Sequence, residues 1–117
     1  MDMLEELKAL GVDTDGGLLR MNGNANLYVR MLGKFVGMMQ KREIPVDFDN
    51  NDYSDVAELA HTIKGTAGNL SLTPIFKAYS EIMDLLRANK PEEAKEVLKG
   101  IIPVQKEILN CIEKHSA

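Results

Sequence analysis

The sequence contains very little cysteine and histidine and few aromatic side chains. Its 117 residues include one cysteine, two histidines and no tryptophan. Because Cys111 is single, an internal disulfide and a metal site built from several cysteines are both excluded. With only His61 and His115 beside it, most zinc and thiol chemistry is excluded as well, and we predict no metal site. Cys111 is expected to lie on a helix with no base nearby, and His115 to be inert near the end of the chain.

The sequence also lacks a long apolar run and a cluster of positive charge. No apolar run approaches the roughly 18 residues of a membrane-spanning helix. The acidic start of the chain does not resemble a secretory signal, which needs a basic start and an unbroken apolar stretch. Lysine and arginine number 14 against 18 acidic residues, so nucleic acid is not an expected partner. These absences predict a cytoplasmic protein, or the cytoplasmic portion of a larger one, with no direct membrane contact.

Apolar residues recur with helical spacing along nearly the whole chain, and no stretch alternates as a strand would. Two short helices are predicted, at 3–10 and 13–21. Four long amphipathic helices follow, at 25–41, at 51–70, from 73 to about 88, and from 91 to near the end of the chain. Short connections between long amphipathic helices predict an all-α antiparallel four-helix bundle with one or two short extra N-terminal helices. Pro103 lies inside the last helix and predicts a kink or break there, because proline removes a backbone donor.

The apolar stripes of two of these helices predict which side chains are buried. In helix 25–41 the stripe is Tyr28, Met31, Leu32, Phe35 and Met38. In helix 51–70 it is Val56, Leu59, Ile63, Ala67 and Leu70. Because this core closes within one chain of 117 residues, we expect one domain over 1–117 that acts as a monomer.

His61 is predicted to face water. At about 100° per residue it lies opposite the apolar stripe of its helix, and Lys64, Gly65 and Gly68 share its side. Each glycine in the middle of a helix costs about 0.5–1 kcal/mol relative to alanine. Packing offers no reason for small residues on this exposed side, whereas a partner that approaches closely would need them. A lone surface histidine usually has no function, but the four residues together indicate a site.

This set of residues is suited to phosphoryl transfer. A neutral imidazole is a competent nucleophile near pH 7, and a surface position allows it to attack a phosphoryl group carried by another protein. Lys64 can stabilise the charge on the phosphoryl oxygens in the transition state. No nucleotide-binding loop is present in the sequence. The expected role is therefore that of a carrier with no ATP site of its own.

The segment from Ala60 to Leu70 resembles the core motif of histidine-containing phosphotransfer (HPt) domains. That family usually reads Ala-His-x-Leu-Lys-Gly-x-(Ser/Ala)-(Gly/Ala) at this point. Upstream, Gly11-Val12-Asp13, Gly17-Leu18, Gly23-Asn24, Tyr28, Met31-Leu32 and Phe35 are similar to the N-terminal half of HPt domains at the ends of hybrid sensor kinases. The resemblance covers about residues 11–86. Ser71, Tyr79 and Met83 depart from residues that are frequent in the family.

The resemblance implies a phosphorelay protein of bacterial two-component signalling. His61 would accept a phosphoryl group reversibly from a receiver-domain aspartate and pass it to another receiver. Lys64 would stabilise the phosphate, and Gly65 and Gly68 would let the partner dock. The partners would be receiver domains of response regulators or hybrid kinases. The domain would need no cofactor of its own, since a divalent metal ion is expected on the receiver.

Two alternatives stay open at this point. One is the phosphoacceptor domain of a chemotaxis-type histidine kinase, which shares a similar His-x-x-Lys-Gly motif but takes its phosphate from ATP on a separate kinase domain. The other is a module that docks receivers without carrying phosphate. If the chain is a part of a hybrid kinase, the parent protein would be a sensor histidine kinase.

Overall fold

The computed structural model describes residues 2–116, and within these residues all of the regular structure is helical. None of the helices in this part of the chain has the length and apolar character that crossing a bilayer requires. The helices are α1 (Met3–Ala9), α2 (Thr14–Arg20), α3 (Ala25–Lys41), α4 (Ser54–Asn69), α5 (Thr73–Arg87) and α6 (Pro91–Ser116).

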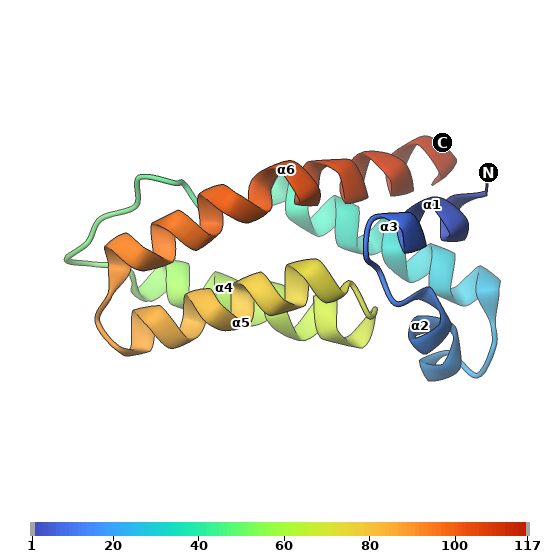
Figure 1. Cartoon of the computed structure of the whole chain (residues 1–117), viewed down its shortest axis with the longest axis horizontal. Helices are drawn as coiled ribbons and strands as arrows, with labels where there is room; N and C mark the ends of the chain where they lie inside the picture. Colours follow the sequence, from blue (N-terminus) through green and yellow to red (C-terminus); the bar gives the residue numbers. More distant parts are fainter. Residues whose placement is uncertain (1, 117) are drawn as a thin grey trace.

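The four long helices run in alternating directions and form an elongated bundle (Figure 1). Together with the short helices, the described chain measures 43 × 24 × 22 Å. α4 and α5 form a tight hairpin that packs on α6, and α3 also packs closely on α6. The short helices α1 and α2 lie at the end of the bundle where α3 begins. The prediction of an all-α four-helix bundle with short N-terminal helices is confirmed.

Local side-chain chemistry determines where several helices begin. The carboxylates of Asp2 and Asp13 accept the backbone N–H groups of the first turns of α1 and α2, at 2.8 and 3.0 Å. The side-chain oxygen of Asn24 does the same for α3, at 3.0 Å from the amide of Leu27. Such caps replace hydrogen bonds that the first turn of a helix cannot make internally. α5 and α6 instead have a proline in the first turn, at Pro74 and Pro91, and a proline has no backbone N–H that needs a partner there.

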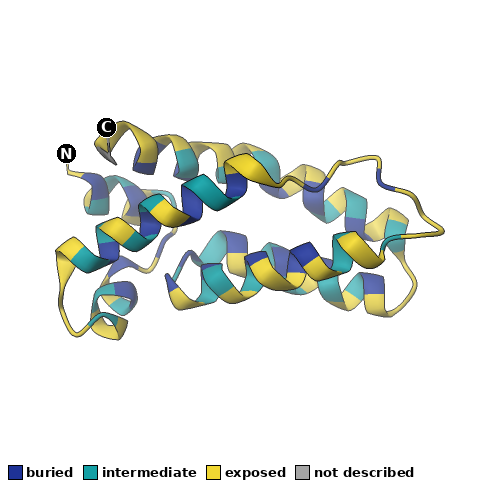
Figure 2. Ribbon diagram, turned by 180° about the vertical axis from the view of Figure 1, so that it is seen from behind, coloured by how far each residue is buried: buried dark blue, intermediate teal, exposed yellow. Residues whose placement is uncertain are grey.

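The buried residues lie on the inward sides of the helices, and most residues on the outward sides are exposed (Figure 2). In α3 the predicted stripe is confirmed for Tyr28, Leu32 and Phe35, but its centre lies part of a turn away from the prediction. The side chains of Val36 and Met39 are buried, whereas Met31 and Met38 are only half-buried. The reason is that α3 packs against α6 more closely than against α4. Met31 and Met38 therefore line a groove of about 710 Å³ on the α4 side of α3.

The predicted stripe of α4 is correct for most of its residues. Leu59, Ile63, Ala67 and Leu70 are buried, and only Val56 is half-buried. α4 begins at Ser54 rather than at residue 51. The chain before it turns at Asp49, whose carboxylate accepts the amide N–H of Asn51 at 2.8 Å.

The predicted break at Pro103 does not occur. α6 continues as one helix from Pro91 to Ser116, with Pro103 inside it. A proline leaves the carbonyl oxygen one turn before it without a helical donor, which here is the carbonyl of Lys99. Both residues lie on the exposed side of α6, so water can take the place of the missing backbone N–H.

Two hydrogen bonds hold α3 and the residue before α2 against the turn between α4 and α5. The buried hydroxyl of Tyr28 donates to the carbonyl oxygen of Leu70 at 2.7 Å. The amide N–H of Asp13 donates to the carbonyl oxygen of Ser71 at 3.0 Å. Gly17 makes room for this arrangement, since a Cβ atom there would lie 2.6 Å from Cε1 of Tyr28. Burial raises the pKa of Tyr28 to about 12, so its hydroxyl stays protonated and remains a donor.

Replacing Gly17 with alanine should therefore destabilise the protein, although glycine is a poor helix former. The new methyl group would push the Tyr28 ring away, and such overpacking costs about 1–3 kcal/mol. Gly37→Ala is the matched control, because a Cβ atom at Gly37 has no neighbour within 4 Å. That variant should instead be more stable, by up to about 1 kcal/mol. Urea unfolding of both variants measures the difference, and equal shifts would show that Gly17 is not a packing residue.

Candidate functional site

α4 turns His61 toward solvent because its opposite side is buried. Leu59, Ile63 and Ala67 face the core, and the side chain of His61 is exposed as predicted. Among the described residues, the structure gives the imidazole no hydrogen bond or ion pair with another side chain or the backbone. Its ring nitrogens are therefore available to an incoming group.

The structure brings all four predicted residues to one groove. His61, Lys64, Gly65 and Gly68 line a surface groove of about 380 Å³ at the junction of α2, α4 and α5. The remaining lining residues are Arg20, Asn69, Ser71, Thr73 and Phe76. Such a hollow is large enough for a phosphoryl group together with the acidic side chain that carries it.

The charge of the groove suits an anion. Its lining includes two cationic side chains, Arg20 and Lys64, and no carboxylate. The two cations come from different helices, α2 and α4, so positive charge reaches the groove from two elements. With His61 as the only imidazole and no acidic side chain, this lining does not provide a ligand set for a divalent metal ion. The groove can therefore bind phosphoryl oxygens directly but is poorly suited to hold a metal of its own.

The two glycines of the groove differ in what surrounds them. A Cβ atom at Gly65 would meet nothing within 4 Å, so this stretch of backbone is open to solvent. A Cβ atom at Gly68 would lie 3.0 Å from Cδ1 of Phe76 on α5. The expectation that packing needs no small residue here is therefore wrong for Gly68, which allows Phe76 to approach α4. For Gly65 the structure offers no such packing reason.

Sequence reasoning missed Arg20 and Phe76. Arg20 is the last residue of α2 and enters the groove because the segment around it is held against the turn after α4. Phe76 is a large apolar side chain that stays 37% exposed beside the histidine. No local pattern places Arg20 near His61, but an aromatic residue on the outer face of α5 could have been noticed from its helical spacing.

Arg20 and Asn69 also line the larger groove between α3 and α4, so the two hollows lie next to each other and share these side chains. The side chains of Met21, Met31 and Met38 make much of that second groove apolar. Methionine is flexible and polarisable, and it adapts to differently shaped partner surfaces. The histidine groove is thus bordered by an apolar surface on one side and by Phe76 on the other.

Cys111 and His115 lie away from this groove, at the end of α6 near α1. The prediction that Cys111 has no base nearby is wrong, because its sulfur lies 3.2 Å from a carboxylate oxygen of Glu6. Burial and the hydrogen bond to Glu6 raise the pKa of Cys111 to about 11, so the thiol is a poor nucleophile. Neither residue lines the groove that contains His61.

Comparison with known proteins agrees with the geometry. The sequence model of the Hpt domain family matches residues 25–116, which include α3 to α6 and the motif around His61. No curated protein and no solved structure gives a significant match to the chain. Since the matched region covers well over half of the sequence, the chain belongs to the Hpt domain family, whose members are phosphocarriers in histidine phosphotransfer relays.

Proposed function

We propose that His61 is the phosphorylated residue, and that it takes a phosphoryl group from a receiver-domain aspartate and gives it to a second receiver. The observation that carries the proposal is that His61 is an exposed, unbonded imidazole in a groove with two cations and no carboxylate. His115 is the other histidine of the chain, and it is paired with Glu6 outside this groove.

The transfer step needs only what the groove contains. A ring nitrogen of neutral His61 attacks the phosphorus atom, and a nitrogen–phosphorus bond forms. The bond between phosphorus and the aspartate oxygen breaks, which leaves the receiver with a free carboxylate. The other ring nitrogen keeps its proton, so no general base is required. Lys64 and Arg20 stabilise the charge on the phosphoryl oxygens. A divalent metal ion, where one is needed, belongs to the receiver in this proposal.

The matched region begins at Ala25, but we propose that α1 and α2 belong to the same functional unit. α2 supplies Arg20 to the groove. The segment before it is tied to the α4–α5 turn through the hydrogen bond between Asp13 and Ser71. Removal of α1 and α2 would therefore take away Arg20, one of the two cations beside His61.

Phosphate labelling tests the role of His61. Incubation with a phosphorylated receiver should label the parent protein with acid-labile, alkali-stable phosphate, and His61→Gln should carry none. Its unfolding free energy should change by less than about 0.5 kcal/mol, because the substituted side chain is exposed. His115→Gln is the matched control and should keep the full label. If only an ATP-loaded kinase labels the protein, the chemotaxis-type alternative is correct, and if neither donor does, the domain only docks receivers.

Loss of either cation, Lys64 or Arg20, should lower the rate of phosphoryl transfer and leave the stability of the fold nearly unchanged. We expect Lys64→Ala and Arg20→Ala each to slow transfer from the receiver by about tenfold or more, equivalent to ~1.4 kcal/mol of transition-state stabilisation. Rapid-quench measurement of phosphohistidine formation gives these rates. Lys106→Ala is the control, since Lys106 lines a separate groove together with Glu43 and Tyr79. Parent-like rates for both groove variants across a range of salt concentrations would mean that the two charges have no role in transfer.

Substitutions at Gly65 should slow phosphoryl transfer from the receiver without lowering the stability of the protein. Gly65→Ala should stabilise the free domain by about 0.5–1 kcal/mol, because the new methyl group meets no neighbour. Gly65→Leu should keep the melting temperature but hold the partner away from His61. In-line attack needs the reacting atoms at about 3–3.5 Å, and a misplacement of about 1 Å can slow a reaction roughly a hundredfold.

Gly100→Leu is the matched control for this series, because Gly100 is another exposed helical glycine with no neighbour within 4 Å. It should leave transfer unchanged. The small donor phosphoramidate, which has no surface to exclude, should be affected far less than the receiver by Gly65→Leu. Normal transfer from the receiver to Gly65→Leu would refute the idea that the partner docks over Gly65.

A further inference from the structure

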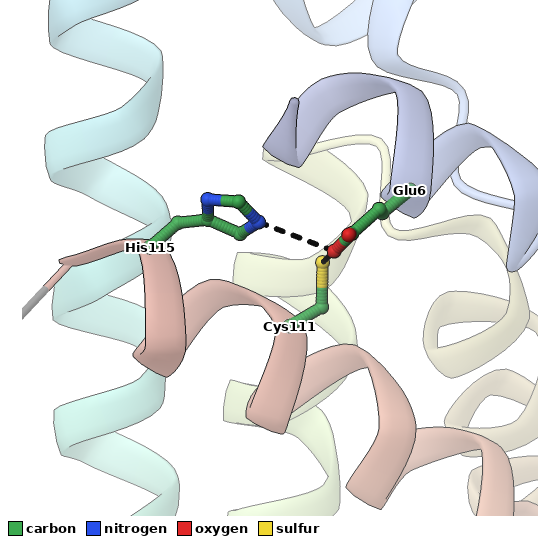
Figure 3. Close-up of side chains that lie close together, drawn as sticks. All are labelled: Glu6, Cys111 and His115. Atoms are coloured by element: carbon green, nitrogen blue, oxygen red, sulfur yellow. Dashed lines mark hydrogen bonds and ion pairs between the residues drawn. The ribbon is translucent and has the colours of Figure 1, made fainter. Parts of the chain in front are cut away.

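Three side chains that can bind metal ions meet where α1 packs on the end of α6 (Figure 3). Glu6 comes from α1, and Cys111 and His115 lie one turn apart on α6. One carboxylate oxygen of Glu6 lies 3.2 Å from the sulfur of Cys111 and 3.2 Å from Nε2 of His115. All three ligand atoms lie within 4.8 Å of one another.

These separations are close to those of a tetrahedral site. Ligands at about 2.0–2.3 Å from a zinc ion are about 3.3–3.8 Å from each other. Two of the three pairs, both involving Glu6, are already slightly closer than this range. The third pair, Cys111 with His115, needs to close by at most about 1.5 Å, which rotation of the two side chains about their χ angles can provide.

The placement of the three residues also suits a metal site. Cys111 is buried, whereas the side chains of Glu6 and His115 are 24% and 31% exposed. The sulfur is thus shielded while one side remains open for an ion and a water molecule to enter. The two residues on α6 are four positions apart, so they project from the same face of the helix. Nζ of Lys114 lies 3.0 Å from Oε2 of Glu6, the oxygen that faces Cys111 and His115, and 3.2 Å from Oε1. A metal ion would therefore have to displace the ammonium group of Lys114 from Oε2.

We propose that Glu6, Cys111 and His115 form a zinc-binding site with a water molecule as the fourth ligand. A thiolate, an imidazole and a carboxylate are the donor types that zinc prefers. On binding, the thiol of Cys111 releases one proton to solvent and forms a sulfur–zinc bond. His115 binds through the lone pair of Nε2, and Glu6 binds through Oε2. Lys114 gives up its contact with Oε2 and keeps the one with Oε1, which is 3.2 Å long in the metal-free protein. The site lies outside the groove of His61 and is independent of the proposed phosphotransfer.

A zinc ion in this position would link the two ends of the described chain. Glu6 and Cys111 are separated by 105 positions in the sequence. Without a metal ion their two helices are held together by the burial of Met3 and Leu7 and by the ion pair between Lys114 and Glu6. Because the site forms only in the folded protein, a bound ion stabilises the fold by mass action. The predicted consequence is a fold whose stability depends on zinc while its phosphoacceptor groove does not contact the metal.

Titration with Co²⁺, a spectroscopic substitute for Zn²⁺, tests the proposal on the intact, reduced and metal-free chain. We expect one equivalent to bind, with a near-ultraviolet thiolate-to-cobalt charge-transfer band and the visible bands of a four-coordinate site. Zn²⁺ should displace Co²⁺ and abolish these bands. At a free zinc concentration one hundred times the Kd, the melting temperature should rise by about 10 °C for a domain of this size.

Variants of the three residues complete the test. Cys111→Ser should lose the charge-transfer band, and His115→Ala and Glu6→Gln should each weaken binding by about tenfold or more. His115→Ala replaces an exposed side chain and keeps the test valid if the buried Cys111→Ser fails to fold. His61→Gln is the matched control and should bind like the parent. The proposal is overturned if no charge-transfer band forms, if His115→Ala and Glu6→Gln both bind like the parent, or if His61→Gln is the variant that loses the ion.

Discussion

The hydrogen bond from the Tyr28 hydroxyl to the carbonyl oxygen of Leu70 joins the start of α3 to the end of the helix that carries His61. It is short, at 2.7 Å, and buried, so loss of the donor would leave a carbonyl oxygen without a partner in a place where that is costly. The bare backbone of Gly17 lies against the same tyrosine ring. α2 is therefore held in contact with α3 and the α4–α5 turn, and Arg20 at its end reaches the groove beside the histidine. One buried contact thus connects the packing of the N-terminal segment to the charge of the site.

α4 shows how folding and function place opposite demands on one helix. Its inner side follows ordinary packing, with buried aliphatic side chains at helical spacing. Its outer side carries Gly65, which weakens the helix and packs against nothing. The cost is acceptable because the buried face and the hairpin with α5 hold α4 in place. Gly68 is different, since Phe76 occupies the space that its side chain would fill. A motif that looks uniform in the sequence therefore combines a packing residue with a residue left open for a partner.

Much of the fold and the centre of the site could be predicted from the sequence, because both depend on local spacing. The bounds of α3 and the outward direction of His61 follow from the cap at Asn24 and from helical periodicity. What could not be predicted depends on how helices pack on each other. Met31 and Met38 belong to the apolar side of α3, yet its close packing on α6 turns them toward a groove. The same limit applies to Arg20, whose position depends on a hydrogen bond between segments distant in sequence.

The cluster of Glu6, Cys111 and His115 shows that limit most clearly. Counting cysteines and histidines indicated too few ligands for a metal site, and the spacing of Cys111 and His115 on one helix face was the only local signal. The third ligand comes from α1, a helix of seven residues whose position is set by burial of Met3 and Leu7 against α6. The histidine groove and the cluster around Cys111 therefore both depend on the short N-terminal helices. α2 brings a cation to the histidine groove, and α1 brings a carboxylate to the cysteine. Since neither helix is long enough to be stable by itself, both contributions exist only while the bundle holds them in place.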